Sequence, residues 1–360
     1  MTESIAVAPT DRADLRQRVD RALADFLRDR RRWLRDVDEA LLEVADAIED
    51  FVLGGGKRLR PAFGYWGYRG AGGADSAQVV TALAALEFVQ ASALIHDDLM
   101  DGSDTRRGEP SVHRRFAAQH RRHGWRGPAD GFGASAAVLL GDLCLVWSDE
   151  LLHGCGLTAG MLRRARPVFD EMRTEVTVGQ YLDVVTQFTG DTSVRRATQI
   201  ARLKSAKYTV ERPLLLGAAL ADAPPSLAAV YSAYGLPLGE AFQLRDDVLG
   251  VFGDPARTGK PAGDDLREGK RTFLVASAYQ ASGPAGRELL DVRLGDPALD
   301  PDGIDQLREL IVASGALAVT EARITELTTR ALAALEPAAV DPQARQVLVD
   351  LAIAATSRTG

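Results

Sequence analysis

The sequence contains few cysteines and histidines, the residues that cross-link small folds or ligate zinc. It contains 2 cysteines and 5 histidines in 360 residues. Cys144 and Cys155 cannot make a disulfide framework, and we expect both to be buried thiols in a reducing cytoplasm. His120 and His123 lie close in sequence but have no acidic or cysteine companions, so a zinc site there is not expected.

Long apolar runs and an excess of basic charge are also missing. No stretch reaches the roughly 18 continuous apolar residues that suggest a membrane span. Residues 1–20 lack the basic start and apolar run of a signal peptide. We therefore expect a cytoplasmic protein without a transmembrane segment. The net charge of −7 argues against a nucleic-acid binder, and "HRRFAAQHRRHGWRG" is interpreted as a solvated helix end and loop.

Strand-like alternation is absent over any useful length, whereas helical periodicity is almost continuous. The stretch "TDRADLRQRVDRALADFLRDRRRWLRDV" predicts an amphipathic helix capped by Thr10 or Asp11. A second helix should cover about Ser76 to Met100. Further helices are predicted to start near Ala134, Leu157, Ser193, Ser226, Leu236, Thr272, Asp302 and Asp341. The fold class is all-α, and because no linker or repeat is visible we expect one large helical domain over residues 1–360.

The segment "LIHDDLMDGSDTRRGEPSVH" ends a long apolar helix in three clustered carboxylates: Asp97, Asp98 and Asp101. Residues four apart on a helix share a face, with about 5–6 Å between their Cβ atoms. Asp97 and Asp101 can therefore hold a cation together, while Asp98 points aside. Carboxylates without histidine or cysteine suit Mg²⁺, which shares its coordination shell with substrate phosphates. The alternative is an exposed acidic helix end.

A second acidic pair, Asp246 and Asp247, follows an amphipathic helix in "FQLRDDVLGVFGD". The position four after Asp246 is Gly250, so this motif reads DDxxG. Gly253 should end the helix before Asp254, which then faces elsewhere. Two acidic helices in one chain favour carboxylates that grip a metal cluster.

Basic residues accompany both acidic motifs, often beside glycine. They are Lys57, Arg58 and Arg60 in "GGGKRLRP", Arg106 and Arg107, Lys204 and Lys207 in "LKSAKYT", and Lys260, Arg267, Lys270 and Arg271 in "TGKPAGDDLREGKR". Lysine and arginine bind phosphate. The pattern indicates two polyanionic groups, one bound through metal and the other directly by basic residues.

From about Leu53 to Phe273 the chain resembles the trans-prenyltransferases, or polyprenyl diphosphate synthases. The motifs "GGKRLRP", "LIHDDLMD", "GQYLD", "FQLRDD" and "GDDLREGKRT" occur in that family's order. The resemblance implies an isoprenoid-synthase helical bundle with a central cavity. It also implies an N-terminal helix and tail (1–35), a catalytic core (36–290) and C-terminal helices (291–360), and a homodimer.

The resemblance further implies a Mg²⁺-dependent condensation of isopentenyl diphosphate with dimethylallyl, geranyl or farnesyl diphosphate. Asp97 and Asp101 would hold two Mg²⁺ ions and Asp246 a third, with Asp98 and Asp247 in support. The groups that would grip the allylic diphosphate are Arg106, Lys204, Lys260 and Lys270. Ser205 and Gln243 would face the allylic cation. Lys207 and Thr209 are the alternative to Lys204 and Ser205.

Isopentenyl diphosphate would be bound by Lys57, Arg60 and Arg107, with Gln90 where the family often has histidine. The family's second acidic motif usually ends in Asp, whereas this chain has Gly250, and Ser205 replaces a family threonine. A class I terpene cyclase would not need "GGKRLRP" with a second acidic pair. A non-catalytic partner subunit commonly loses its aspartates, and a two-metal phosphoryl-transfer enzyme normally uses strands.

We expect the helix that carries Asp97 to set the length of the product. Small Ala93 and Ser92 lie just before the acidic motif and should let a tail of three isoprene units pass. Phe88, one turn further back, is the candidate floor, which favours geranylgeranyl diphosphate. Phe88 as an ordinary core residue, closure by Tyr181, and a longer-chain or farnesyl product are the alternatives.

Overall fold

The computed structural model describes residues 9–254, 263–296, 298–336 and 338–357. These residues group into two compact units, which we describe separately. The first unit comprises Met1–Arg166 and Leu216–Asp222, and the second comprises Pro167–Leu215 and Ala223–Gly360. The prediction of one domain, with its internal boundaries and central cavity, stays a prediction.

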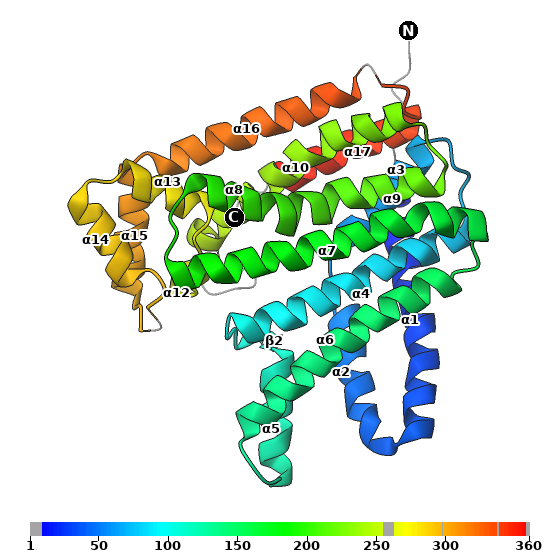
Figure 1. Ribbon diagram of the computed structural model, residues 1–360, viewed down its shortest axis with the longest axis horizontal. Coiled ribbons are helices and arrows are strands. Elements are labelled where there is room, and N and C mark those ends of the chain that lie inside the picture. Colours follow the sequence, from blue (N-terminus) through cyan, green and yellow to red (C-terminus); the bar gives the residue numbers. More distant parts are fainter. Residues whose placement is uncertain (1–8, 255–262, 297, 337, 358–360) are drawn as a thin grey trace. The chain divides into compact units, whose positions relative to one another are not determined.

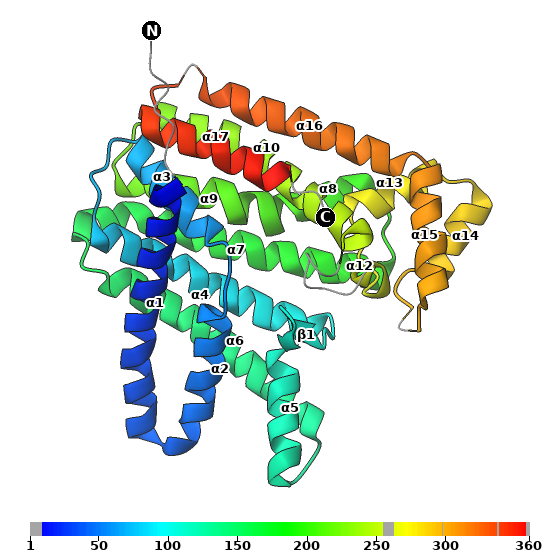
Figure 2. The ribbon, with the colours of Figure 1, turned by 180° about the vertical axis from the view of Figure 1, so that it is seen from behind.

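The first unit contains helices and one short hairpin. Its elements are α1 (Pro9–Val37), η1 (Glu39–Leu41), α2 (Leu42–Leu53), α3 (Leu59–Gly70), α4 (Ala77–Met100), β1 (Thr105–Arg106), β2 (Glu109–Pro110), α5 (Val112–His123) and α6 (Ala129–Gly154). Helices α1 and α2 form a hairpin, and α4 lies alongside α6 with α5 folded against one end of α6 (Figures 1 and 2).

Two helices, α7 (Ala159–Thr189) and α9 (Arg212–Leu220), have residues in both units. The other elements of the second unit are α8 (Val194–Ala201), η2 (Arg202–Glu211), α10 (Pro225–Phe252), α12 (Asp264–Arg267), α13 (Phe273–Ala281), α14 (Pro284–Arg293), α15 (Pro301–Ala313), α16 (Ala316–Leu335) and α17 (Pro342–Thr356). Helix α10 packs against α16 and against η2, which is a π-helix.

The all-α prediction is confirmed. The only strands among the described residues are β1 and β2, two residues each, paired antiparallel with Arg106 opposite Glu109. The helix predicted from Ser76 to Met100 is α4, and the Ser76 hydroxyl caps it by accepting a hydrogen bond from the Val79 N–H. The predicted cap of α1 is wrong, because the helix already begins at Pro9.

The predicted helix start near Leu236 is also wrong. Helix α10 runs from Pro225 to Phe252 without a break and contains Pro237 in its interior. Proline removes one backbone hydrogen bond from a helix, and burial of Pro237 with its neighbours Leu238 and Gly239 keeps this helix intact. Tertiary packing here overrides a local breaker signal.

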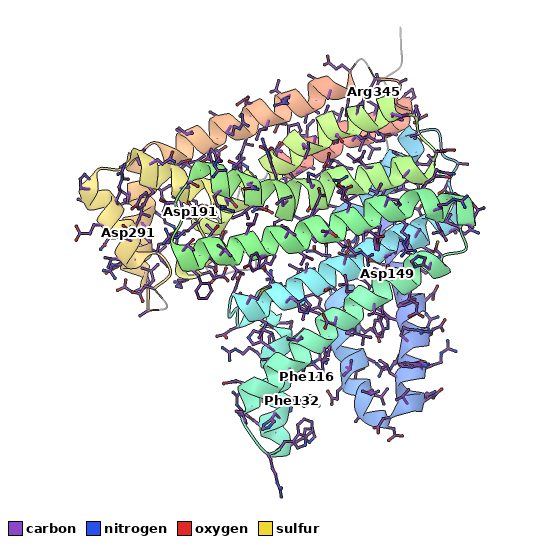
Figure 3. All side chains as sticks on the ribbon, viewed as in Figure 1. Phe116, Phe132, Asp149, Asp191, Asp291 and Arg345 are labelled. Carbon is purple, nitrogen blue, oxygen red and sulfur yellow. The ribbon has the colours of Figure 1, made fainter. Side chains whose placement is uncertain are left out.

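Helix α4 is the core of the first unit. Its buried residues lie all around the helix, which is the pattern of a helix enclosed on every side. Phe88 is fully buried and makes edge-to-face contacts with Phe26 of α1 and Trp147 of α6, with ring centroids 5.3 and 6.0 Å away. At the far end of α6, Phe116 and Phe132 lie beside each other (Figure 3).

Both cysteines are buried thiols, as predicted. By length and composition alone, α4 and α6 are apolar enough to cross a membrane. Core helices of soluble proteins pass the same test, and 72% of the apolar window of α4 is buried, against 28% of that of α6. Helix α4 is therefore a core helix, whereas α6 leaves apolar side chains uncovered within this chain.

Phe88→Ala should lower the free energy of unfolding by about 3–5 kcal/mol, because it leaves a cavity among three packed aromatic rings. Denaturant unfolding followed by circular dichroism measures this loss. The control is Val312→Ala on α15, whose side chain is 54% exposed and whose removal should cost within about 0.5 kcal/mol. Equal small losses for both variants would contradict the role of Phe88 in the core.

Candidate active site

The first acidic motif occupies the last turn of α4 in the first unit. Asp97 lies on the helix, and its carbonyl accepts a 2.8 Å hydrogen bond from the N–H of Asp101, the C-cap residue. Both side chains are partly buried, whereas Asp98 is only 1% exposed. The Arg106 guanidinium donates to Asp98, with Nε 2.9 Å from Oδ1, and so compensates the buried carboxylate. The backbone bond from Asp101 to Asp97 continues the helical turn, which is consistent with the predicted shared face of the two carboxylates.

The end of α4 is fixed against α6 through His96, the residue before the motif. Its Nε2 lies 3.1 Å from the Val138 carbonyl oxygen. Gly141 makes this approach possible, because a Cβ there would lie 2.1 Å from His96 Nε2. The backbone that carries Asp97 is therefore positioned by a close helix–helix contact.

The basic loop of the first unit is organised by Arg58, which is 5% exposed. Its guanidinium donates to Asp20 of α1, to Glu87 of α4 and to the Val52 carbonyl, at 2.7, 2.7 and 2.8 Å respectively. Arg58 therefore points inward, in a left-handed backbone conformation (φ 48°), and ties the loop to three helices. Two of its partners are carboxylates, which compensate the buried guanidinium.

The predicted ligands of isopentenyl diphosphate lie on the loop of this buried arginine or on the segments that it contacts. Lys57 is exposed and Arg60 is half-buried in the first turn of α3. Arg107 donates to the Gly55 carbonyl at 2.9 Å, so it joins the segment after the acidic motif to the glycine loop. Gln90 is half-buried on α4, one turn after Glu87. Lys57, Arg60, Arg107 and Gln90 thus all lie in the first unit. They come from the basic loop and the start of α3, from the residue after β1, and from α4.

The second acidic motif lies near the end of α10 in the second unit. Asp246 is half-buried and Asp247 is 4% exposed. The amide nitrogen of Gln243, one turn earlier, donates to Asp247 Oδ1 at 2.7 Å, which leaves the amide oxygen for another partner. Burial raises the pKa of Asp247 to about 8, with further contributions from the charges of Asp265, Asp246 and Asp183.

The π-helix η2 brings Lys204 to this acidic region. Lys204 Nζ lies 2.9 Å from the carboxylate of Asp183 on α7, whose charge also acts on Asp247. Gly179 permits the contact, because a Cβ there would lie 2.9 Å from the backbone nitrogen of Lys204. Ser205 is 5% exposed in the same segment.

Lys207, the alternative to Lys204, belongs to a different ion cluster. It pairs with Glu175, which also accepts from Arg212 Nε at 2.7 Å. These cations hold the pKa of Glu175 below its usual value, although burial opposes them. Thr209 is buried at 2% exposure. Lys204 is thus linked through Asp183 to the second acidic motif, whereas Lys207 is paired with Glu175, and the choice between the two pairs stays a prediction.

Lys270 follows α12, where its backbone N–H donates to the Asp265 carbonyl at 3.0 Å. Its Nζ lies 2.5 Å from Glu268 and 3.7 Å from Asp265 Oδ1. Lys260 lies outside the described residues. Asp254 follows the end of α10 at Phe252, as predicted.

Sequence reasoning missed three acidic residues that position the predicted ligands: Glu87, Asp183 and Asp265. Asp183 stands in the quoted motif "GQYLD", one turn after Gly179, and that spacing was the available signal. Glu87 is a charge within an otherwise apolar run of α4, which indicates a buried partner. Nothing local indicated that Asp265 approaches α10.

Each acidic motif offers carboxylate oxygens alone, which is the donor chemistry that Mg²⁺ prefers. Among the described residues, no three His, Cys, Asp or Glu side chains are clustered as a ready-made metal site. Mg²⁺ commonly takes one or two carboxylates and completes its shell with water and substrate phosphates. The residues therefore fit a magnesium ion that arrives with a diphosphate.

Asp247→Asn should remove part of the pH dependence of stability of the metal-free protein. The carboxyl has a usual pKa of 3.8, and its folded-state pKa is about 8. Between these values the folded state binds more protons than the unfolded state, so stability falls as pH rises. Urea unfolding in EDTA at about pH 5 and about pH 8 should show a smaller fall for the variant. The exposed Asp36→Asn is the control, and an unchanged fall in Asp247→Asn would refute the assignment.

Comparison with known proteins agrees with the acidic and basic motifs described above. The Polyprenyl synthetase family profile matches residues 42–311. The geranylfarnesyl diphosphate synthase of Aeropyrum pernix is 32% identical over 82% of this chain and 88% of its own length. The geranylgeranyl diphosphate synthase of Mycobacterium tuberculosis is 30% identical over 80% and 77%.

A solved structure is more similar still. The geranylgeranyl pyrophosphate synthase of Corynebacterium glutamicum, complexed with isoprenyl diphosphate and magnesium, has a TM-score of 0.93 and 42% identity over 96% of this chain and 99% of its own. Relatives of this chain are named for farnesyl, geranylgeranyl, geranylfarnesyl and octaprenyl products. The chain belongs to the polyprenyl synthetase family of prenyltransferases.

Proposed function

We propose that the protein is a geranylgeranyl diphosphate synthase, which joins isopentenyl diphosphate head to tail to an allylic diphosphate to give an all-trans product. The observation that carries this proposal is the pairing of two carboxylate-only helix ends with basic residues that are themselves fixed by buried partners. In the first unit the basic loop is fixed by Arg58, and in the second Lys204 is fixed by Asp183. Transfer from a diphosphate needs carboxylates that hold metal ions and basic groups that bind the phosphates, because both stabilise the charge of the leaving group.

Asp97 and Asp101 would bind two Mg²⁺ ions and Asp246 a third. When bound, these ions neutralise the diphosphate leaving group and so promote ionisation of the allylic C1–O bond. Arg106, Lys204, Lys270 and Lys260 would bind the same diphosphate. The hydroxyl of Ser205 and the amide oxygen of Gln243 would then face the allylic cation, and the bond from Gln243 to Asp247 supports that orientation.

Isopentenyl diphosphate would be bound without metal by Lys57, Arg60, Arg107 and Gln90. The double bond attacks C1 of the allylic cation, and a proton then leaves the carbon next to the new cationic centre. The departing diphosphate accepts this proton, so no side-chain base is required. Asp98 and Asp247 support neighbouring groups, since Asp98 holds Arg106 and Asp247 holds Gln243.

The geranylgeranyl product length rests on small side chains just before the first acidic motif. Ser92 is 5% exposed and Ala93 is half-buried on α4. The contacts of Phe88 with Phe26 and Trp147 favour its role as a core residue over its role as a floor. Tyr181, the other candidate floor, is 68% exposed. The proposal therefore depends more on Ser92 than on Phe88.

We also propose a cytoplasmic homodimer whose interface includes α6. Exposed apolar residues follow one face of this helix at helical spacing, and Val138, Leu139 and Val146 are 44%, 65% and 60% exposed. An apolar helix face of this kind commonly marks a protein interface. A second copy of the chain fits it because an identical face is itself apolar.

Asp97→Ala and Asp246→Ala should each lower condensation on the order of a thousandfold or more, because each removes a magnesium ligand from the leaving group. The assay incubates purified protein with Mg²⁺, labelled isopentenyl diphosphate and dimethylallyl, geranyl or farnesyl diphosphate. The exposed Asp36→Asn is the matched control. Full activity of Asp97→Ala without divalent metal would disprove the mechanism, and cyclised products without isopentenyl diphosphate would favour a terpene cyclase.

Ser92→Phe should shorten the product toward farnesyl or geranyl diphosphate, because an aromatic ring would block the path beside α4. Product length is read by chromatography of the dephosphorylated alcohols. Ser92→Ala preserves the small volume and should give the wild-type length. A folded Ser92→Phe variant that still makes the wild-type product would show that this face of α4 does not line the tail.

Leu139→Glu combined with Val146→Glu should convert the dimer to a monomer, since it places charges in an apolar interface. Sedimentation velocity measures the change. Val292→Glu on α14, at a position 67% exposed, is the control and should leave the dimer intact. A wild-type protein that is monomeric at working concentration would refute the homodimer.

A further inference from the structure

The π-helix η2 lies directly on the surface of α10. A Cβ at Gly239 of α10 would lie 2.3 Å from the Cα of Ala206, and a Cβ at Gly235 would lie 2.8 Å from the Cα of Glu211. The later glycine contacts the earlier residue of η2, so the two helices are antiparallel. Glycine at these two positions lets the backbones approach more closely than side chains would allow.

The first residue of η2 is held by a buried carboxylate of α10. The side chain of Glu240 is only 8% exposed, although it carries a charge. Its Oε1 accepts a hydrogen bond from Nε of Arg202. A second cation, Arg323 of α16, lies 3.8 Å from Oε2, which is beyond hydrogen-bond distance. Because a buried carboxylate needs a partner, the bond to Arg202 fixes the start of η2 on α10.

Both ends of the π-helical segment therefore meet α10, at Arg202 and at Glu211. A π-helix is bonded from each N–H to the carbonyl five residues earlier, and here the N–H of Arg212 donates to the Lys207 carbonyl. Its side chains consequently point in directions that differ from those of an α-helix of the same sequence. This conformation is rare, so the contacts at its two ends stabilise a register that the segment would not keep by itself.

Residues proposed to serve the allylic diphosphate follow this contact on both helices. On η2, Lys204 and Ser205 come two and three residues after Arg202, and on α10 Gln243 comes three residues after Glu240. A change in the register of η2 would therefore move the lysine and the hydroxyl relative to the amide of Gln243. The other candidate pair, Lys207 and Thr209, also lies on η2 and would move as well.

We propose that Glu240 is a positioning residue that holds the start of η2 on α10 through Arg202 and thereby directs the lysine and hydroxyl of η2 toward the allylic diphosphate. The inference rests on the proposed function, because these groups are ligands only there. Arg323 is the competing partner of the same carboxylate. When Arg202 is removed, Glu240 can turn toward α16, and η2 then loses the contact that fixes its first residue.

The experiment compares Glu240→Gln, Arg202→Ala and the double variant. Each single change should raise KM for the allylic diphosphate about tenfold and leave KM for isopentenyl diphosphate within about twofold. The double variant should be no worse than either single variant, because two residues in contact lose their interaction only once. Hydrogen–deuterium exchange, followed by mass spectrometry without substrate, should show faster exchange of the backbone amides of residues 202–211 in all three variants.

Arg323→Ala is the matched control, because it removes the other cation near the same carboxylate and leaves the bond to Arg202 in place. Both KM values should stay within about twofold of wild type, and the exchange of η2 should not change. If Glu240→Gln fails to fold, Arg202→Ala carries the test, since the Arg202 side chain is 53% exposed.

Three results would overturn the proposal: losses that multiply in the double variant, equal effects on both substrates, or an effect of Arg323→Ala as large as that of Arg202→Ala. A wild-type protein that does not condense the two substrates would instead refute the proposed function. The exchange of residues 202–211 would then still decide whether Glu240 holds η2 on α10.

Discussion

Charge buried beside apolar helices must be paired within the chain, and this constraint organises both units. Taking an ion out of water costs several kcal/mol unless partners replace the lost hydration. Asp98 is paired by Arg106, and Arg58 is paired by Asp20 and Glu87. The Arg58 pairs join elements that are distant in sequence, and the Asp98 pair joins α4 to the hairpin that follows it. The pairing therefore does more than offset a cost, because it also fixes the backbone next to less buried residues that are predicted to bind ligands.

Because of this constraint, adjacent charged residues differ in burial and in the contacts that they make. In "GGGKRLRP" the middle arginine is buried while Lys57 is exposed and Arg60 is half-buried. In the two DD pairs the second aspartate is buried, at 1% for Asp98 and 4% for Asp247, and the first is only partly buried. The buried member of each set holds a neighbour in position. The more exposed member is the one that is predicted to bind a ligand.

The sequence was sufficient for features that depend on local pattern. Helical periodicity predicted α4 closely, from about Ser76 to Met100, and the DDxxD motif lies at the end of this helix. Local pattern failed at Pro237, since burial keeps α10 continuous through the proline. It also could not separate Lys204 from Lys207, because each lysine has a hydroxyl residue one or two positions after it, Ser205 and Thr209 respectively. The two lysines have different partners on α7, Asp183 for Lys204 and Glu175 for Lys207, and the choice between them stays a prediction.

Close contacts between helices were the least predictable feature, although glycines mark each of them. Gly141 admits the ring of His96, Gly179 admits the backbone of Lys204, and Gly250 admits the carboxylate of Asp265. In a single sequence such glycines look like weak points of a helix, since glycine disfavours helix interiors by about 1 kcal/mol relative to alanine. Each is instead a place where a group beside one of the acidic motifs approaches a helix more closely than a side chain at that glycine would allow. The three contacts differ in kind, because a histidine ring, a backbone nitrogen and a carboxylate fill the space beside the three glycines, so no single sequence pattern around a glycine could have predicted them.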